Sequence, residues 1–352
     1  MTIDNSTESI HTVEAEAKKR GPGAWLSSIF ENKYIGWAAL GTAILLPFID
    51  SSTYTLNILT TAAIFVVLAA GLNIVVGYCG LLDLGYIAFL AVGAYTAGIL
   101  SKMFVLPVLF TLPAVIIMCI LSGLIIGAPT LRLRSDYLAI VTLGFGEITR
   151  ITAQNLEITG GPQGIYNIPS YLVIGDLDFQ DPVIFYFLTI VIVSGLVLAA
   201  ARLGKSRLGR AWKFVKEDED AAEAMGIHTY KVKLLAYIFG AIWGGFGGML
   251  FASHLTAISP PSFLFLQSAL VLMAVVLGGM GNMKGVVVGA LAISLLPEFL
   301  RDFSAYRYLI FGLLLVVVMV FRPQGLWPPR GVEAERTKAQ REAAALANGL
   351  KR

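Results

Sequence analysis

Residues 202–233 read RLGKSRLGRAWKFVKEDEDAAEAMGIHTYKVK and separate two groups of long apolar runs. The segment holds eight Lys or Arg and five Asp or Glu, whereas 57% of the 352 residues are hydrophobic and 14% are charged. Soluble domains have about 25% charged residues, and a chain with a mean hydropathy of +0.76 cannot hide its apolar surface inside one water-soluble core. The sequence therefore predicts an all-α polytopic membrane protein, with 202–233 as a polar loop between two sets of helices.

Ten apolar runs are candidates for transmembrane helices, because a helix needs about 17 to 25 mostly apolar residues to cross a bilayer. The runs are 34–50, 54–76, 81–101, 105–127, 136–153, 183–201, 234–257, 263–280, 286–300 and 306–321. The resulting segments are a polar arm over 1–33, helices 1–6 over 34–201, helices 7–10 over 234–322 and a polar tail over 323–352. About ten helices are expected, because one run contains Glu147 and Arg150 and another is short.

The distribution of Lys and Arg predicts the orientation, because cytoplasmic loops collect basic residues. With ten helices and the N-terminus inside, 22 of the 26 Lys and Arg residues lie on the cytoplasmic side, and only Lys102, Arg301 and Arg307 lie outside. The longest outer loop, 154–182, has no Lys or Arg and four acidic residues. Both termini and the loop 202–233 are therefore expected in the cytoplasm.

The second half of this loop predicts a short helix. The acidic run 217–220 suits a first helical turn, where the backbone dipole favours negative charge. Alanines and Met225 form the body, and Gly226 suits a left-handed C-cap. Just before it, apolar and basic residues alternate at helical spacing, which indicates an amphipathic segment: Leu208, Trp212 and Val215 with Arg210, Lys213 and Lys216. The loop either lies on the membrane surface or inserts into a groove of a cytoplasmic partner.

The run DAAEAMG, 220–226, resembles the E-A-A-x-x-x-G loop of ABC importer permeases, with Asp in place of the first Glu. Six longer stretches resemble the branched-chain amino-acid ABC permease family and, within it, the M-type subunit. They are GLNIVVGYCGLLDLGYIAFLAVGAYTAG (71–98), LRSDYLAIVTLGFGEITRI (133–151), ITGGPQGI (158–165), LGRAWKFVKEDEDAAEAMGI (208–227), VVLGGMGNMKG (275–285) and FRPQGL (321–326). The resemblance extends from about Ala62 to Leu326.

The resemblance implies the ABC importer permease fold in a bacterial inner membrane and a role in branched-chain amino-acid uptake. The implied partners are a second, H-type permease, two cytoplasmic ATPase subunits, an extracytoplasmic binding protein and membrane lipid, with no nucleic acid. The residues implied to couple the permease to the ATPases are Arg210, Glu217, Asp220, Ala221, Ala222, Met225 and Gly226. The sequence contains no G-x-x-x-x-G-K-[ST] phosphate-binding motif, so ATP and Mg²⁺ are expected on partner chains, and this chain is not expected to be an enzyme.

Two alternatives to this function stay open at this point. The same architecture carries urea or short amides in related permeases, and selectivity would then reside in the binding protein. An ion-coupled secondary transporter would need no ATPase subunits, and the charged loop would have no evident role in it. The scattered positions of His11, His228 and His254 indicate neither a metal site nor a nucleophile–base pair.

Ionisable residues and helix breaks inside the membrane indicate the translocation path. Glu147 and Arg150 share a helix face and form an ion pair or line the route of a zwitterion. Asp83 is expected as a solvated carboxylate near the cytoplasmic surface. Glycine-rich turns at 77–80 and 278–281 resemble each other and predict two breaks at the inner side. The candidate path residues are Gly80, Asp83, Gly85, Tyr86, Glu147, Arg150 and Gly281.

Three further patterns concern packing and docking. Gly240, Gly244 and Gly248 lie on one helix face and allow close approach of a neighbouring helix, either inside this chain or in a permease dimer. The two cysteines, in apolar surroundings, are expected to pack without a disulfide: Cys79 and Cys119. The outer loop contains a Gly- and Pro-rich turn that is either a turn without further function or a contact surface for a binding protein: Thr159, Gly160, Gly161, Pro162 and Gln163.

Overall fold

The computed structural model describes residues 52–131, 135–169, 173–174, 177–178, 181–299, 309–310, 312–313 and 316. The chain divides into two compact units, Met1–Asp50 and Ser51–Arg352, and all described residues lie in the second. Its helices are α4 (Thr53–Leu72), α5 (Ile87–Phe104), α6 (Leu112–Thr130), α7 (Ser135–Asn155), α8 (Pro182–Leu203), α9 (Arg207–Glu217), α10 (Glu219–Ala224), α11 (Thr229–Leu255), α12 (Phe265–Gly278) and α13 (Met283–Phe299). The described unit is therefore built almost entirely from helices.

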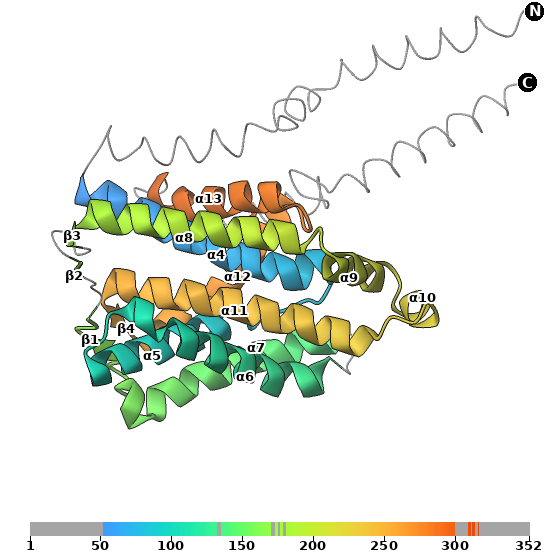
Figure 1. Ribbon diagram of the computed structural model, residues 1–352, viewed down its shortest axis with the longest axis horizontal. Helices are drawn as coiled ribbons and strands as arrows, with labels where there is room; N and C mark the ends of the chain where they lie inside the picture. Colours follow the sequence, from blue (N-terminus) through green and yellow to red (C-terminus); the bar gives the residue numbers. More distant parts are fainter. Residues whose placement is uncertain are drawn as a thin grey trace, which may run out of the picture. The chain divides into compact units, whose positions relative to one another are not determined.

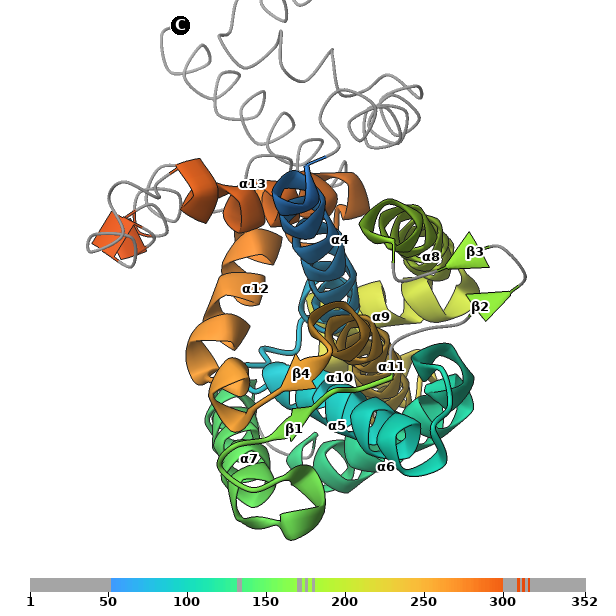
Figure 2. The same ribbon diagram turned by 90° about the vertical axis from the view of Figure 1, so that its left-hand side faces the viewer.

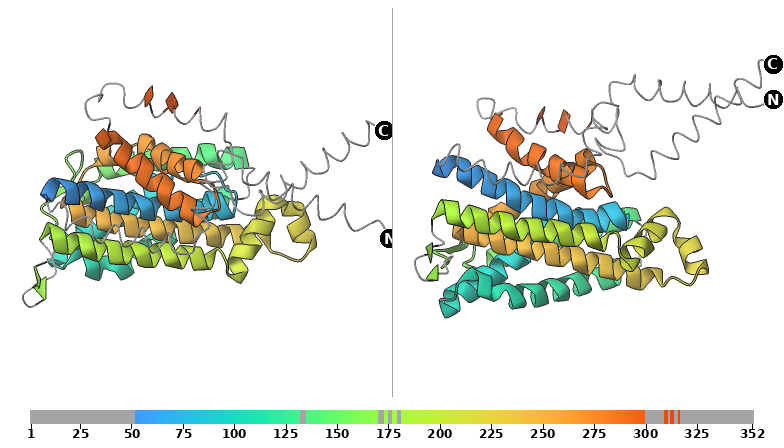
Figure 3. Two further views of the ribbon diagram at one scale, coloured as in Figure 1. Left: turned by 90° about the horizontal axis from the view of Figure 1, so that it is seen from above. Right: turned by 45° about the horizontal axis from the view of Figure 1, so that its top comes forward.

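The long helices lie side by side, so their ends form two groups (Figures 1 and 3). One end, which we call the strand end, holds four two-residue strands. They are β1 (Ile165–Tyr166), paired antiparallel with β4 (Ala257–Ile258), and β2 (Val173–Ile174), paired antiparallel with β3 (Leu177–Asp178). The opposite end, which we call the charged end, holds α9 and α10. The loop 202–233 is thus separated from the outer loop 154–182 by the length of the helices, as the sequence predicts.

Six helical segments are long and apolar enough to cross a membrane within the described residues. They are Thr53–Tyr78, Ile87–Phe104, Val108–Thr130, Pro182–Leu203, Thr229–Leu255 and Pro260–Gly278. The chain is therefore a multi-pass membrane protein. Two further expected spans form helices outside this set, because α7 carries Asp136, Glu147 and Arg150 and α13 has 17 residues. The expected spans 34–50 and 306–321, the arm 1–33 and the tail 323–352 lie outside the described residues, apart from five positions between 309 and 316.

The core forms around α11, which packs against α4, α5 and α6 (Figure 2). The glycine stripe on α11 allows this close approach. A Cβ atom added at Gly240 would lie 2.3 Å from Val75 Cγ2, and one added at Gly244 would lie 2.7 Å from Phe89 Cβ. The stripe therefore serves an internal helix contact, which is one of the two uses expected from the sequence. The two cysteines are free and buried in this core, as predicted.

Both predicted helix breaks are present. A π-helical segment, Asn73–Tyr78, extends α4 and ends before Gly80, which has φ +77°. The left-handed conformation of Gly80 ends the first helix, and residues 79–86 are nonhelical, so the next helix, α5, begins at Ile87 rather than at the expected residue 81. In the second break, α12 ends at Gly278, and Gly279 and Gly281 have φ values of +106° and +89°.

Candidate functional site

Helix α9 is an amphipathic helix whose apolar face packs on the protein. Ser206 caps it, accepting a hydrogen bond from the Gly209 N–H at 3.2 Å. Trp212 is fully buried, and its indole nitrogen donates to the Val232 carbonyl of α11 at 2.8 Å. The apolar residues Trp212 and Val215 therefore pack on the protein itself. The Arg210 guanidinium donates a hydrogen bond at 3.1 Å to the carbonyl of Lys205, in the turn before α9.

Helix α10 is the predicted short helix, but it begins two residues later than expected, at Glu219 instead of Glu217. Asp218 is its N-cap and accepts a hydrogen bond from the Ala221 N–H at 3.0 Å. Because Asp218 is extended, with φ −156°, Glu217 belongs to the last turn of α9 and not to the first turn of α10. Gly226 ends the helix with φ +83°, as its predicted C-cap role requires. The helix therefore begins with Glu219 and Asp220.

The tip of α10 presents an apolar surface to solvent. Met225 is 84% exposed, whereas Ala222 is buried. Ala221 and Ala224 are exposed beside it. An exposed methionine next to alanines leaves room for another backbone to approach closely, as in a protein-binding surface. We call residues 219–226 the knob.

The knob is tied to α11 by two polar contacts. Glu219 forms an ion pair with Lys233, and the Thr229 hydroxyl donates to the Glu223 carboxylate at 2.6 Å. The buried Trp212 adds a third attachment of the loop to the same helix. Residues 207–233 thus form one structural block with the first turns of α11, which we call the loop block.

The two helix breaks meet at the charged end. The Gly281 N–H donates to the Asn73 side-chain oxygen at 2.8 Å, although 208 positions separate them. A Cβ atom added at Gly77 would lie 2.6 Å from the Gly281 nitrogen. The Asn73 side-chain nitrogen is buried, and nothing in the described part of the chain accepts its hydrogen bonds. Asn73 is not among the residues predicted from the sequence, although an asparagine inside the apolar run 71–76 indicates a buried polar contact.

The expectation of a solvated carboxylate at Asp83 is wrong, because this residue is completely buried. Its Oδ1 accepts a hydrogen bond from the Gly85 N–H at 2.9 Å, and the hydroxyls of Thr142 and Tyr237 lie beside it. The nonhelical segment 79–86 folds inward, which carries the carboxylate away from the surface. Asp83 therefore lies where the start of α5, α7 and α11 join.

Tyr86 and Gly85 hold the same junction together. The Tyr86 hydroxyl donates to the Gly240 carbonyl of α11 at 2.9 Å. A Cβ atom at Gly85 would lie 1.7 Å from the Thr142 carbonyl oxygen, so only glycine fits between the segment 79–86 and α7. Both residues therefore have structural contacts that account for their positions.

Glu147 and Arg150 form the ion pair that was one of the two expectations for them. Arg150 Nε lies 3.1 Å from both carboxylate oxygens of Glu147, and a terminal guanidinium nitrogen reaches Gln154 Oε1 at 3.3 Å. The side chain of Glu147 is 44% exposed and that of Arg150 is 19% exposed. The pair therefore lies on the outer face of α7.

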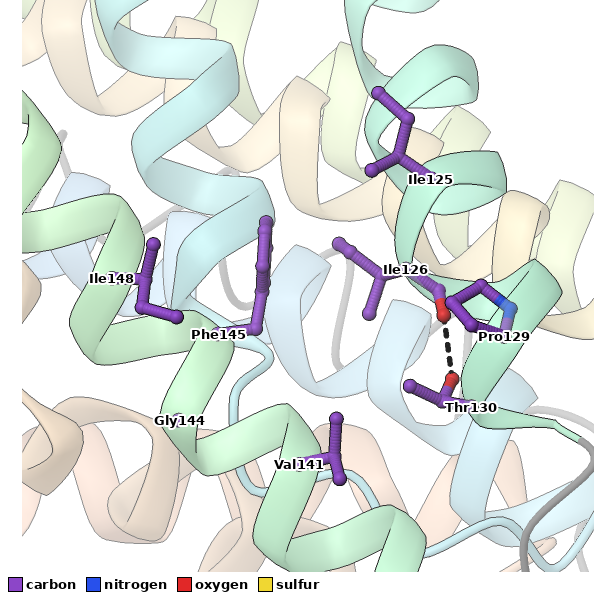
Figure 4. A pocket seen from close by; sticks show the side chains of 8 residues that line it. All are labelled: Ile125, Ile126, Pro129, Thr130, Val141, Gly144, Phe145 and Ile148. Carbon is purple, nitrogen blue, oxygen red and sulfur yellow. Dashed lines mark hydrogen bonds between the residues drawn. The ribbon is translucent and has the colours of Figure 1, made fainter.

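A groove of about 390 Å³ lies between α6 and α7 (Figure 4). It is lined by Ile125, Ile126, Pro129, Thr130, Val141, Gly144, Phe145 and Ile148. The Thr130 hydroxyl is engaged with the Ile126 carbonyl at 2.7 Å. The walls offer no charged group to an ammonium or a carboxylate, so this groove does not suit a zwitterion.

A metal site was not expected from the sequence. Among the described residues, no group of three or more His, Cys, Asp or Glu side chains could hold a metal ion.

The turn 159–163 lies at the strand end. Gly160 and Gly161 have positive φ values and shape the turn, while Pro162 and Gln163 are exposed. The Thr159 side chain is buried, and its hydroxyl donates to the Leu156 carbonyl at 2.7 Å. The turn thus presents its backbone and two side chains outward, and Thr159 stabilises it from within.

The chain resembles known membrane transport proteins over most of its length. Residues 54–319 match the family described as branched-chain amino acid transport system, permease component. The high-affinity branched-chain amino acid transport system permease protein LivM of Escherichia coli (strain K12) is 42% identical over 314 residues, which cover 83% of this chain and 74% of that protein. LivM of Salmonella typhimurium is 41% identical over 86% of this chain and 76% of that protein.

A more distant similarity concerns a differently named permease. LivH of Escherichia coli (strain K12), also a high-affinity branched-chain amino acid transport system permease protein, is 28% identical over 123 residues, which cover 34% of this chain and 40% of that protein. No solved structure matches the chain significantly.

Proposed function

Since the chain belongs to the family of branched-chain amino acid transport permeases, we propose that it is the M-type membrane subunit of an ABC importer that moves branched-chain amino acids into the cytoplasm. The observation that carries this proposal is the exposed knob, held by ion-paired and hydrogen-bonded contacts on a long membrane helix. An exposed apolar tip at the charged end is explained by a protein partner that covers it.

The partners proposed with it follow the family organisation. A second, H-type permease completes the membrane channel, and the similarity to LivH supports a subunit of that kind. Two cytoplasmic ATPases bind ATP and Mg²⁺, because this sequence has no phosphate-binding motif. A binding protein delivers cargo at the strand end, near Pro162 and Gln163. The inner membrane is the proposed location, with the charged end in the cytoplasm.

The mechanism transmits movement from the knob to the core. ATP binding closes the two ATPases, and the closure displaces the knob that they hold. The Glu219–Lys233 and Glu223–Thr229 contacts pass this displacement to α11. Because α11 packs against α4, α5 and α6, its movement changes the packing of several spans at once. That change alternates the access of the path between the two sides.

The same structure is compatible with cargo of related chemistry. Urea and short amides are the alternative cargo, because the same architecture carries them in related permeases. Ligand binding to the cognate binding protein separates these cargoes. A binding protein that takes leucine, isoleucine or valine supports the proposal, whereas one that takes only urea or an amide contradicts the cargo assignment.

The function itself is tested by reconstitution of the complete transporter in liposomes. ATP-dependent uptake of branched-chain amino acids is expected only when the ATPase subunits are present. Purification in a mild detergent is expected to recover the chain together with an ATPase and a second permease. Full uptake driven by an ion gradient, with the ATPases omitted, would identify a secondary transporter instead.

Gly226 provides a test of the knob's shape. A Cβ atom at Gly226 would meet nothing within 4 Å, so a substitution acts through the backbone conformation alone. Gly226→Val is expected to cost about 1–2 kcal/mol in the left-handed conformation and to lower substrate-stimulated ATPase activity about tenfold. Gly226→Asn is the matched control, because Asn tolerates this conformation better than other residues. Equal ATPase activity in the two variants would contradict the role of the C-cap.

A further inference from the structure

Lys216 connects the loop block to the first helix break. Its ammonium donates a hydrogen bond to the Gly77 carbonyl at 2.9 Å, and 139 positions separate the two residues. Gly77 lies in the last turn of the π-helical extension of α4. Carbonyls at a helix C-terminus carry partial negative charge and favour a cation, so the lysine caps this broken helix.

The aliphatic part of the Lys216 side chain packs against the same break. A Cβ atom at Gly80 would lie 2.8 Å from Lys216 Cγ, so the left-handed glycine leaves space for the lysine chain. Partial desolvation of the ammonium lowers the pKa of Lys216 from its ordinary value. Although part of its side chain stays exposed, the lysine is therefore a close contact between α9 and the break.

Two neighbouring contacts join α9 and the turn before it to the break. Lys213 Nζ lies 5.8 Å from the centre of the Tyr78 ring, within the range of a cation–π interaction. The Tyr78 ring lies against Gly204, where a Cβ atom would approach its Cζ to 2.5 Å. The break is thus contacted by Lys216 and Lys213 of α9 and by Gly204 in the turn before this helix.

The opposite side of this break contacts the second break. The Gly281 N–H donates a hydrogen bond to the Asn73 side-chain oxygen and lies close to Gly77. The residue that accepts the Lys216 hydrogen bond therefore also borders the other broken helix. A displacement of α9 along this line reaches both breaks without passing through α11.

We propose that Lys216 is a positioning residue that couples movement of the loop block to the paired helix breaks. The proposal rests on the proposed ABC importer function and adds a second route of transmission to the one through α11. In this arrangement the knob sets the position of α9, and the Lys216–Gly77 hydrogen bond moves the break with it. Without the hydrogen bond, ATP is still hydrolysed, but less solute crosses for each ATP.

The test compares Lys216→Met with Lys231→Met in the reconstituted importer. Methionine keeps much of the apolar stem and removes the charged donor. Lys231 is the matched control, because it is an exposed lysine of the same loop. A charge-assisted hydrogen bond contributes enough for its loss to lower the solute moved per ATP about tenfold. ATPase binding and the amount of protein in the membrane are expected to stay at wild-type levels in both variants.

The outcomes separate this inference from the proposed function. A wild-type importer without ATP-driven uptake defeats the proposed function. A wild-type importer that transports, together with a Lys216→Met variant that moves the same amount of solute per ATP, overturns the inference alone. If the Lys216→Met variant does not assemble, amide hydrogen exchange in the wild-type importer tests the inference instead. Trapping the ATPases with ATP and vanadate is expected to change the exchange of the Gly80 and Leu81 amides, which bond to Val76 and Val75. Unchanged exchange at these amides overturns the inference.

Discussion

Gly248→Leu is expected to prevent the membrane core from packing. A Cβ atom at this position would lie 2.2 Å from the Leu90 carbonyl oxygen and 2.6 Å from the Ala94 nitrogen. Both are backbone atoms of α5, so relief requires α5 and α11 to separate along their contact. Overpacking against backbone atoms costs about 3 kcal/mol or more. The variant should accumulate as aggregated or degraded protein, as measured by the yield of a monodisperse peak in detergent and by its thermal midpoint.

The matched control is Gly195→Leu in α8. A Cβ atom at Gly195 meets nothing within 4 Å, so the same chemical change adds no clash within the described part of this chain. The yield and thermal midpoint of Gly195→Leu should match the wild type. A Gly248→Leu protein with wild-type yield and midpoint would show that the close contact between α11 and α5 is not needed for folding.

Met225→Glu is expected to abolish coupling between the permease and its ATPases. Met225 is the most exposed large hydrophobic residue among those described and lies at the tip of the knob. An apolar anchor at the centre of an interface contributes about 2 kcal/mol or more, so a charge there should weaken ATPase association at least about thirtyfold. The measurement is ATPase binding to the solubilised permease, followed by substrate-stimulated hydrolysis in liposomes.

Met225→Leu is the control for this experiment, because it keeps an apolar side chain of similar volume. The Leu variant should bind the ATPases with nearly wild-type affinity. Since the Met225 side chain is 84% exposed, neither change should alter the thermal stability of the permease alone. If Met225→Glu bound and stimulated the ATPases normally, the knob would not be their contact surface.

Local signals in the sequence predicted the loop block and the helix breaks. The acidic run before the alanines and the glycine at 226 are features that act on neighbouring residues, so the short helix and its left-handed end could be predicted from them. The glycine-rich turns at 77–80 and 278–281 likewise indicated both breaks. The N-terminus of the short helix shifted by two residues, because an extended Asp218 terminates α9.

Contacts between distant segments could not be predicted in the same way. The Lys216–Gly77 and Gly281–Asn73 hydrogen bonds join residues far apart in the chain. The burial of Asp83 depends on the path of the segment 79–86 against α7 and α11, which hydropathy does not encode. Charge alone therefore suggested a solvated carboxylate, whereas the packing of three helices around it decided the outcome.

The central claim, that the knob faces the cytoplasm and is covered by an ATPase, is tested most directly by labelling a Met225→Cys variant with a membrane-impermeant maleimide. The native cysteines at 79 and 119 are buried, so little background is expected. The account predicts labelling in inside-out vesicles, loss of that labelling when the ATPase subunits are added, and no labelling in right-side-out vesicles. Labelling of the introduced thiol from the outside, or undiminished labelling in the assembled transporter, would contradict it.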